Sequence, residues 1–171
     1  MSAYGRILLA GLGSFTLLAS ALLFQYLGEL APCPMCIWQR WPHLAAVLIA
    51  LAATTVLWRQ RRPLAVAGAL TMTISAGLGA YHAGVEQGWW PGPAGCSGVD
   101  PSGLTPDELL TRLAQTPLVR CDEIVWEFLG ISMAGWNGLL SAAFALLWLF
   151  AALPRRPTRH VSPEEHSGRA G

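Results

Sequence analysis

Charged side chains are scarce in this sequence, and lysine is missing altogether. Asp, Glu and Arg make up 12% of the 171 residues, whereas 53% are hydrophobic. Soluble domains usually carry about a quarter charged residues, and disordered chains are poor in apolar ones. The composition therefore excludes a mainly disordered chain and disfavours a water-soluble domain. The formal net charge of +1 also gives no electrostatic reason to expect nucleic-acid binding.

Four long stretches lack charge completely. They cover residues 7–27, 41–58, 64–81 and 133–153. A membrane-spanning helix needs about 20 mostly apolar residues, and lipid favours helices because the backbone must satisfy its own hydrogen bonds there. The sequence thus predicts an all-α membrane protein, an antiparallel four-helix transmembrane bundle that forms a single domain over residues 1–153. We expect residues 154–171 to be a disordered tail.

The first stretch has one alternative interpretation, a cleavable signal peptide. Its apolar run is longer than the core of such peptides, and no clear cleavage site follows it before Cys33. We therefore expect it to be retained as a membrane span.

The arginines predict the orientation of the bundle. Eight of the eleven lie before the first stretch, between the second and third, or after the fourth: Arg6, Arg59, Arg61, Arg62, Arg155, Arg156, Arg159 and Arg169. Because basic residues are enriched in cytoplasmic loops, we expect both termini in the cytoplasm and the chain in the bacterial inner membrane. A short loop over residues 28–40 and a long loop over residues 83–132 would then face the periplasm.

The long loop carries two helix signals. Residues 105–108 have the N-cap, the proline and the capping-box glutamate of a helix start. Residues 122–129 would place apolar and acidic side chains on different sides of a helix, which is typical of a helix lying in the membrane interface. We expect a short helix at each position, with a solvated turn as the alternative for each.

All four cysteines fall in the two outward loops: Cys33, Cys36, Cys96 and Cys121. Cysteines used as small hydrophobic core residues would be scattered through the spans. Their confinement to one side indicates thiol chemistry in an oxidising compartment, which is the periplasm for a bacterial membrane protein of this orientation.

The segment Cys33-Pro34-Met35-Cys36 directly precedes the second apolar stretch. Its C-x-x-C spacing allows a close disulfide. Cys36 would lie near the first turn of a helix, where unpaired backbone N–H groups and the helix dipole favour a thiolate. Arg40 follows four residues later, so it can lie one turn along the same face and add a positive charge. We therefore expect Cys36 to be the reactive sulfur.

Other uses of the cysteines fit less well. A c-type haem would need a histidine directly after the second cysteine, where Ile37 stands. A zinc site would prefer two C-x-x-C pairs, whereas Cys96 and Cys121 are 25 positions apart, so we expect no metal. A non-catalytic membrane scaffold with two static disulfides remains the alternative. It explains two bridges but gives no reason for a thiolate and an arginine at the membrane edge.

Redox-active cysteine pairs would need an electron acceptor. Making a disulfide in another protein releases two electrons and two protons, and the sequence has no glycine-rich nucleotide loop, no haem motif and no charged relay in its spans. A lipid-soluble quinone, ubiquinone or menaquinone, fits this need. Cys36 would donate electrons to it, and Arg40 would donate a hydrogen bond to a ring oxygen. The Cys96–Cys121 loop would carry electrons from a soluble partner by disulfide exchange.

The sequence resembles the DsbB family of disulfide bond formation proteins over about residues 5–153. The resemblance rests on residues 32–40, Cys96, residues 121–130, Met133 and Trp136. It implies a membrane quinone reductase that reoxidises a periplasmic dithiol oxidase with a thioredoxin fold, of the DsbA type. A paralogue dedicated to one partner is an alternative. A vitamin K epoxide reductase would be expected to carry its C-x-x-C near the last helices, whereas here the motif precedes the second.

The resemblance also implies a role for each cysteine. Cys96 would be attacked by the reduced partner, forming a mixed disulfide. Cys121 would pair with Cys96 at rest and exchange with Cys33 after that attack. Cys36 would interact directly with the quinone.

Two further residues follow from the resemblance, and three are left aside. Arg40 would help to bind the quinone. His82 lies near the outer end of the third helix, where a histidine is implicated in some family members, so it is a candidate quinone-binding residue; an interfacial residue without that role is the alternative. We expect His43 to be a packing residue. Glu86 and Gln87 could line the mouth of the quinone site, but we expect them to stand in a solvated loop start.

Overall fold

The computed structural model describes residues 1–93, 96, 103–115 and 119–154. Its long helices are α1 (Ala3–Tyr26), α2 (Pro34–Thr54), α3 (Arg61–Glu86) and α5 (Met133–Ala152), and a short 3-10 helix, η1 (Trp58–Gln60), links α2 to α3. The four long helices are long and apolar enough to cross a membrane. The protein is thus an all-α, multi-pass membrane protein, as the sequence predicts. Except for Pro154, the predicted tail lies outside the described residues.

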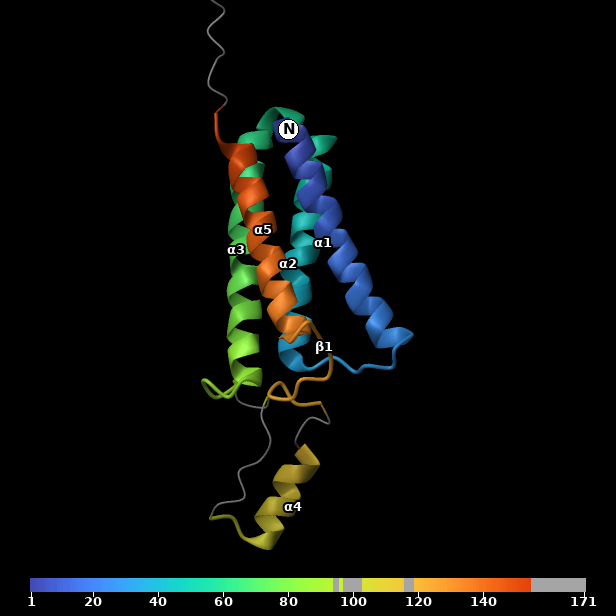
Figure 1. Cartoon of the computed structure of the whole chain (residues 1–171), viewed down its shortest axis with the longest axis vertical. Coiled ribbons are helices and arrows are strands. Elements are labelled where there is room, and N and C mark those ends of the chain that lie inside the picture. Colours follow the sequence, from blue (N-terminus) through green and yellow to red (C-terminus); the bar gives the residue numbers. More distant parts are fainter. Residues whose placement is uncertain (94–95, 97–102, 116–118, 155–171) are drawn as a thin grey trace, which may run out of the picture.

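The four long helices form a bundle in which α3 and α5 make the most extensive contact, while α1 packs on α2 and α5. The N-terminus, η1 and the end of α5 lie together at one end of the bundle, and the α1–α2 and α3–α5 connections lie at the other (Figure 1). The second end is the one that carries the cysteines. The bundle therefore separates the arginine-rich connection from the cysteine-bearing ones, as expected.

Close contact between α3 and α5 depends on glycine. A Cβ atom at Gly79 would lie 2.6 Å from the backbone nitrogen of Gly138 on α5. A Cβ at Gly68 would lie 2.4 Å from the ring of the buried Trp148. Small residues at such crossings let two membrane helices pack backbone to backbone. This seam fixes α3, which carries His82, against α5.

Helix α2 begins and ends earlier than the predicted span over residues 41–58. It begins earlier because the C-x-x-C segment is itself the first turn of the helix. Cys33 is the N-cap residue, and its Sγ accepts a hydrogen bond from the Cys36 backbone N–H at 3.2 Å. Pro34 occupies the first helical position, where no N–H is needed. At the other end, the hydroxyl groups of Thr54 and Thr55 donate to carbonyl groups one turn earlier, an interaction that competes with regular helix continuation.

The predicted capping box opens a short helix, α4 (Pro106–Gln115). The Thr105 backbone N–H donates to Glu108 Oε2 at 2.9 Å, and the Glu108 N–H donates to Thr105 Oγ1 at 3.4 Å. These reciprocal bonds satisfy two free donors at the helix start. The first of the two helix predictions for the long loop is confirmed.

The second is wrong. Instead of an interfacial helix over residues 122–129, the chain forms a hairpin of two short antiparallel strands, β1 (Glu127–Phe128) and β2 (Ile131–Ser132). The turn residues Leu129 and Gly130 have φ values of 54° and 72°. Two successive positive φ values are typical of the tight turn that joins hairpin strands, and they are incompatible with an α-helix.

Candidate functional site

The fold brings the two cysteine pairs together. Cys96 and Cys121 form a disulfide, and Cys33 and Cys36 are free. Cys33 and Cys121 are buried, and their sulfur atoms lie within 4.8 Å of one another and of a ring nitrogen of His82. Two segments that are far apart in the sequence thus place one sulfur of each pair at a distance from which a small movement allows disulfide exchange.

The free pair is asymmetric. Cys33 Sγ donates to Cys36 Sγ at 2.8 Å. This hydrogen bond and burial raise the pKa of the Cys33 thiol. A proton shared by the two sulfurs therefore stays on Cys33, and Cys36, in the first turn of α2, is the sulfur that carries negative charge. The role of Cys36 as the reactive sulfur stays a prediction.

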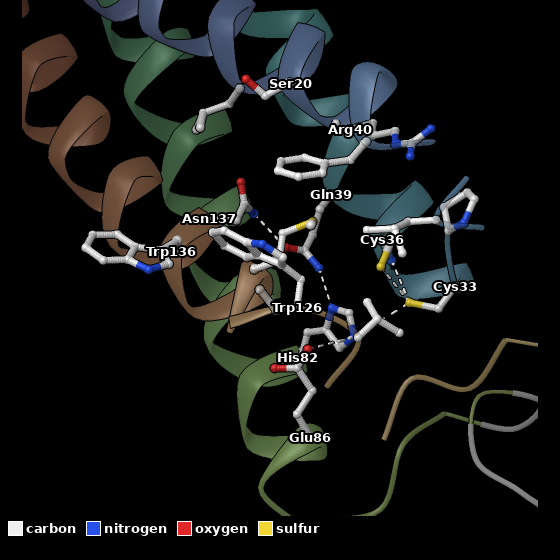
Figure 2. A pocket seen from close by; sticks show the side chains of 18 of the residues that line it. Ser20, Cys33, Cys36, Gln39, Arg40, His82, Glu86, Trp126, Trp136 and Asn137 are labelled. Carbon is white, nitrogen blue, oxygen red and sulfur yellow. Dashed lines mark hydrogen bonds and ion pairs between the residues drawn. The ribbon is translucent and has the colours of Figure 1, made fainter. Parts of the chain in front are cut away.

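A cavity of about 440 Å³ lies beside these sulfurs. Side chains from α1, α2, α3, α5 and the segments next to Cys33 and Cys121 line it, and most of the lining is apolar. Its polar lining includes Cys33, Cys36, Gln39, Arg40, His82 and Glu86, several of which point toward one another in Figure 2. The size and the mixture of apolar walls with a few polar groups are typical of a small-molecule site.

Arg40 lines the same cavity as Cys36, as their spacing predicts. Its Nη1 donates to Gln25 Oε1 of α1 at 2.6 Å. Its Nε is buried and has no hydrogen-bond partner among the described residues. A buried guanidinium N–H without a partner is costly. This atom is therefore suited to an acceptor on a ligand in the cavity.

His82 is buried, with 2% of its surface exposed, and lies next to the free thiols. Its Nε2 is 3.6 Å from Cys33 Sγ and 3.9 Å from Glu86 Oε1. Glu86 is the last residue of α3, has a largely buried side chain and accepts a hydrogen bond from Ser132 Oγ. The expectation of a solvated Glu86 is therefore wrong. His82 lines the cavity, and the free thiol of Cys33 lies beside it.

A family model described as "Disulfide bond formation protein DsbB" matches residues 5–151. The chain belongs to the DsbB family. A relative named "Disulfide bond formation protein B" from Polaromonas sp. (strain JS666 / ATCC BAA-500) is 34% identical over 148 residues, which cover 82% of this chain and 85% of the relative. One with the same name from Albidiferax ferrireducens is 35% identical over 158 residues, covering 88% and 87%. As a DsbB protein, the chain is an oxidoreductase of disulfide bond formation.

Sequence reasoning missed two amides in this DsbB site. Gln39 Nε2 donates to His82 Nδ1 at 2.7 Å, and Asn137 Nδ2 donates to Gln39 Oε1 at 2.6 Å. His43, expected to be a packing residue, donates from Nε2 to Asn137 Oδ1 at 2.7 Å. One signal could have found them. Asn137 is the only asparagine of the chain and lies inside an apolar stretch, where polar residues are costly and are often functional.

Proposed function

We propose that this protein reoxidises a periplasmic dithiol oxidase with a thioredoxin fold, of the DsbA type, and passes the electrons to a membrane quinone, ubiquinone or menaquinone. The observation that carries the proposal is the position of Cys33. This residue lies between the Cys96–Cys121 disulfide and Cys36, which lines a largely apolar cavity. A route for electrons from a soluble partner into the membrane needs this order.

The first steps are disulfide exchanges. A thiolate of the reduced partner attacks Cys96, which forms a mixed disulfide and releases Cys121 as a thiolate. Cys121 then attacks Cys33 of the oxidised Cys33–Cys36 pair, and Cys36 leaves as a thiolate. Each exchange forms one disulfide and breaks one, so the two electrons reach Cys36 without an outside oxidant.

The cavity residues fit a quinone. When bound, a quinone accepts two electrons and two protons. Cys36 would supply the electrons, and the unpaired Nε of Arg40 would donate to a ring oxygen that becomes negative. Phe24 of α1 and Trp126, whose ring centroids are 5.6 Å apart, belong to the apolar lining that would cover the ring and exclude water.

The proposal includes an orientation in the bacterial inner membrane, with both termini in the cytoplasm and the cysteines in the periplasm. Two observations support it. The arginine-rich connection around η1 and the N-terminus lie at the same end of the bundle (Figure 1), and the cysteine pairs at the other end need an oxidising compartment.

The decisive experiment supplies the purified protein with a reduced thioredoxin-fold dithiol oxidase and a soluble quinone. We expect quinone reduction that is lost in Cys33→Ser and in Cys36→Ser. No quinone reduction by the wild-type protein would contradict the proposed acceptor. If both variants supported normal periplasmic disulfide formation in cells and only lowered the protein level, the cysteines would be a static scaffold.

A further inference from the structure

Polar side chains form a hydrogen-bonded chain that leads from the thiols into the apolar interior. Its members, in order, are Cys33, His82, Gln39, Asn137 and His43. They come, in that order, from the start of α2, from α3, from α2, from α5 and again from α2 (Figure 2 shows the first four). At the deep end of the chain, the hydroxyl groups of Ser75 and Ser141 also lie near His43 Nε2. Such groups are costly inside a membrane protein, and the proposed electron route uses only the cysteine end. The rest of the chain needs another explanation.

The Gln39 amide gives the chain a direction. Gln39 Nε2 lies 3.3 Å from the backbone oxygen of Met35 and 2.7 Å from His82 Nδ1. A carbonyl oxygen only accepts, so the NH₂ group must face Met35, and its second hydrogen points to His82. The opposite orientation would bring two oxygens together. His82 Nδ1 is therefore an acceptor.

The deep end of the chain favours the same direction. Asn137 donates to Gln39 Oε1 and accepts from His43 Nε2, so the proton of neutral His43 is on Nε2. His43 Nδ1 is buried without a partner among the described residues. In the observed direction Nδ1 is an unused acceptor, whereas a reversed chain would leave an unpaired N–H there. Orphaned buried N–H groups are the rarer case in proteins.

We propose that Gln39, Asn137 and His43 are positioning residues that hold neutral His82 with its proton on Nε2, directed at Cys33. The acceptors recorded close to the His82 ring are the Cys33 sulfur, Glu86 Oε1 and the backbone carbonyl of Cys121. The Cys121 carbonyl is neutral, and a charged acceptor such as a Cys33 thiolate makes the stronger hydrogen bond. The chain thus supplies a hydrogen-bond donor to Cys33 whenever that sulfur is a thiolate.

The His82 Nε2–H donor acts in the step that restores the Cys96–Cys121 disulfide. Cys96, once freed from the partner, attacks Cys121 of the Cys33–Cys121 bond. The Cys96–Cys121 bond forms, and Cys33 leaves with the electron pair as a thiolate. A leaving sulfur that is stabilised as a thiolate departs faster. The described state, with Cys96–Cys121 bonded and Cys33 free, is the product of this step. The inference rests here on the proposed function.

The tautomer of His82 can be measured directly. The protein is labelled with ¹⁵N-histidine, reconstituted in nanodiscs and reduced only at Cys33 and Cys36, and the His82 signals are assigned by their loss in His82→Phe. We expect a protonated Nε2 and an unprotonated Nδ1 in the wild-type protein. A wild-type His82 with its proton on Nδ1 overturns the proposal without any need for a stable variant.

Two variants test whether the chain sets this tautomer. Gln39→Met removes the donor to Nδ1, and Asn137→Leu removes the donor that holds the Gln39 oxygen away from His82. We expect both to give a mixture of the two tautomers. Ser14→Ala is the matched control, because Ser14 is fully buried on α1 and donates its hydrogen bond to Met72, outside the hydrogen-bonded chain. The Ser14→Ala variant should retain the wild-type His82 signals. If His82 remains purely Nε2-protonated in both variants, the proposal is wrong.

A second readout reports on the sulfur itself. In Cys36→Ala protein with the Cys96–Cys121 disulfide intact, iodoacetamide alkylation at constant pH measures the thiolate fraction of Cys33. Adding Gln39→Met should slow it about tenfold, because a hydrogen bond to a charged group is lost. An unchanged rate contradicts a role for the chain at Cys33. These measurements use neither quinone nor partner, so their failure and that of the proposed function are distinguishable.

Discussion

At the scale of single residues, the division of labour between Cys33 and Cys36 follows from one hydrogen bond. Because Cys33 donates to Cys36, the pKa of the Cys33 thiol is raised, and Cys33 stays protonated at pH values where an ordinary thiol, with a pKa of about 8.5, has begun to ionise. Neutral pH therefore leaves one reactive sulfur in the reduced pair.

This asymmetry predicts the order of alkylation. At pH 8, with Cys96–Cys121 intact, mass spectrometry after iodoacetamide treatment should find Cys36 modified first. In Cys36→Ala the bond that raises the pKa of Cys33 is gone, so Cys33 should react faster than in the wild-type protein. Faster alkylation of Cys33 than of Cys36 in the wild-type protein would contradict the asymmetry.

Arg40 makes a separate prediction at this scale. Arg40→Gln removes the charged donor from the cavity and should raise the KM for a soluble quinone about tenfold or more. The KM for the reduced protein partner is the internal control and should not change. Arg40→Lys should recover only part of the affinity, because lysine keeps the charge but not the planar N–H groups. An unchanged quinone KM in Arg40→Gln would remove Arg40 from the site.

At the scale of elements, the seam between α3 and α5 positions His82. Gly79 lies one turn before His82, and its contacts on α5 are backbone atoms of Gly138 and Ala134, which cannot move aside as a flexible side chain would. Any side chain at Gly79 must push the two helices apart. The site therefore depends on a close approach at Gly79 and Gly138, which do not themselves line the cavity.

Two glycines of α3 provide a matched test of this dependence. Gly79→Ala should destabilise the bundle by about 1–3 kcal/mol through overpacking and should reduce thiol oxidation. Gly77→Ala, two residues away, has no atoms within 4 Å of the new Cβ and should be neutral or slightly stabilising. Thermal unfolding in detergent and activity at matched protein levels measure both effects. Equal effects of the two substitutions would show that the seam does not position the site.

At the scale of the whole molecule, the proposed topology predicts where each thiol is accessible. After mild reduction of intact cells or spheroplasts, a membrane-impermeant maleimide added from outside should label the cysteines. A cysteine placed by substitution at Arg59, in η1, should be labelled only after the membrane is opened. Labelling of either native cysteine pair from the cytoplasmic side alone would reverse the topology and contradict the proposed function.

How much of this molecule the sequence predicts depends on whether the signal is local. The four uncharged stretches are predictable because a backbone in lipid must form helices to satisfy its hydrogen bonds. The capping box at Thr105 and Glu108 likewise marks the start of α4 from local sequence alone. The helix prediction for residues 122–129 was wrong because a short segment of mixed apolar and acidic residues is compatible with both a helix and a hairpin. Gly130 was the available clue, since a positive φ at that position ends any helix.

The residues of the site also fall into those that local sequence predicts and those that it does not. Cys33, Cys36 and Arg40 are placed by spacing along one helix, so the sequence predicts them. The contacts of Gln39 with His82 and of Asn137 with His43 depend on how α2, α3 and α5 are rotated about their own axes. The spans are apolar on all sides because lipid surrounds them, and composition therefore carries little information about that rotation.

The N-cap of α2 has one more consequence. The sulfur of Cys33 caps the helix, since it accepts the Cys36 backbone N–H in the reduced state. In the proposed mechanism the same sulfur takes part in the redox reaction. Closing the bond to Cys36 turns this atom into a poorer acceptor, so oxidation loosens the first turn that reduction tightens. The order of the first turn of α2 is thereby thermodynamically linked to the redox state of the Cys33–Cys36 pair. Amide hydrogen exchange at Cys36 should therefore be faster in the oxidised than in the reduced protein.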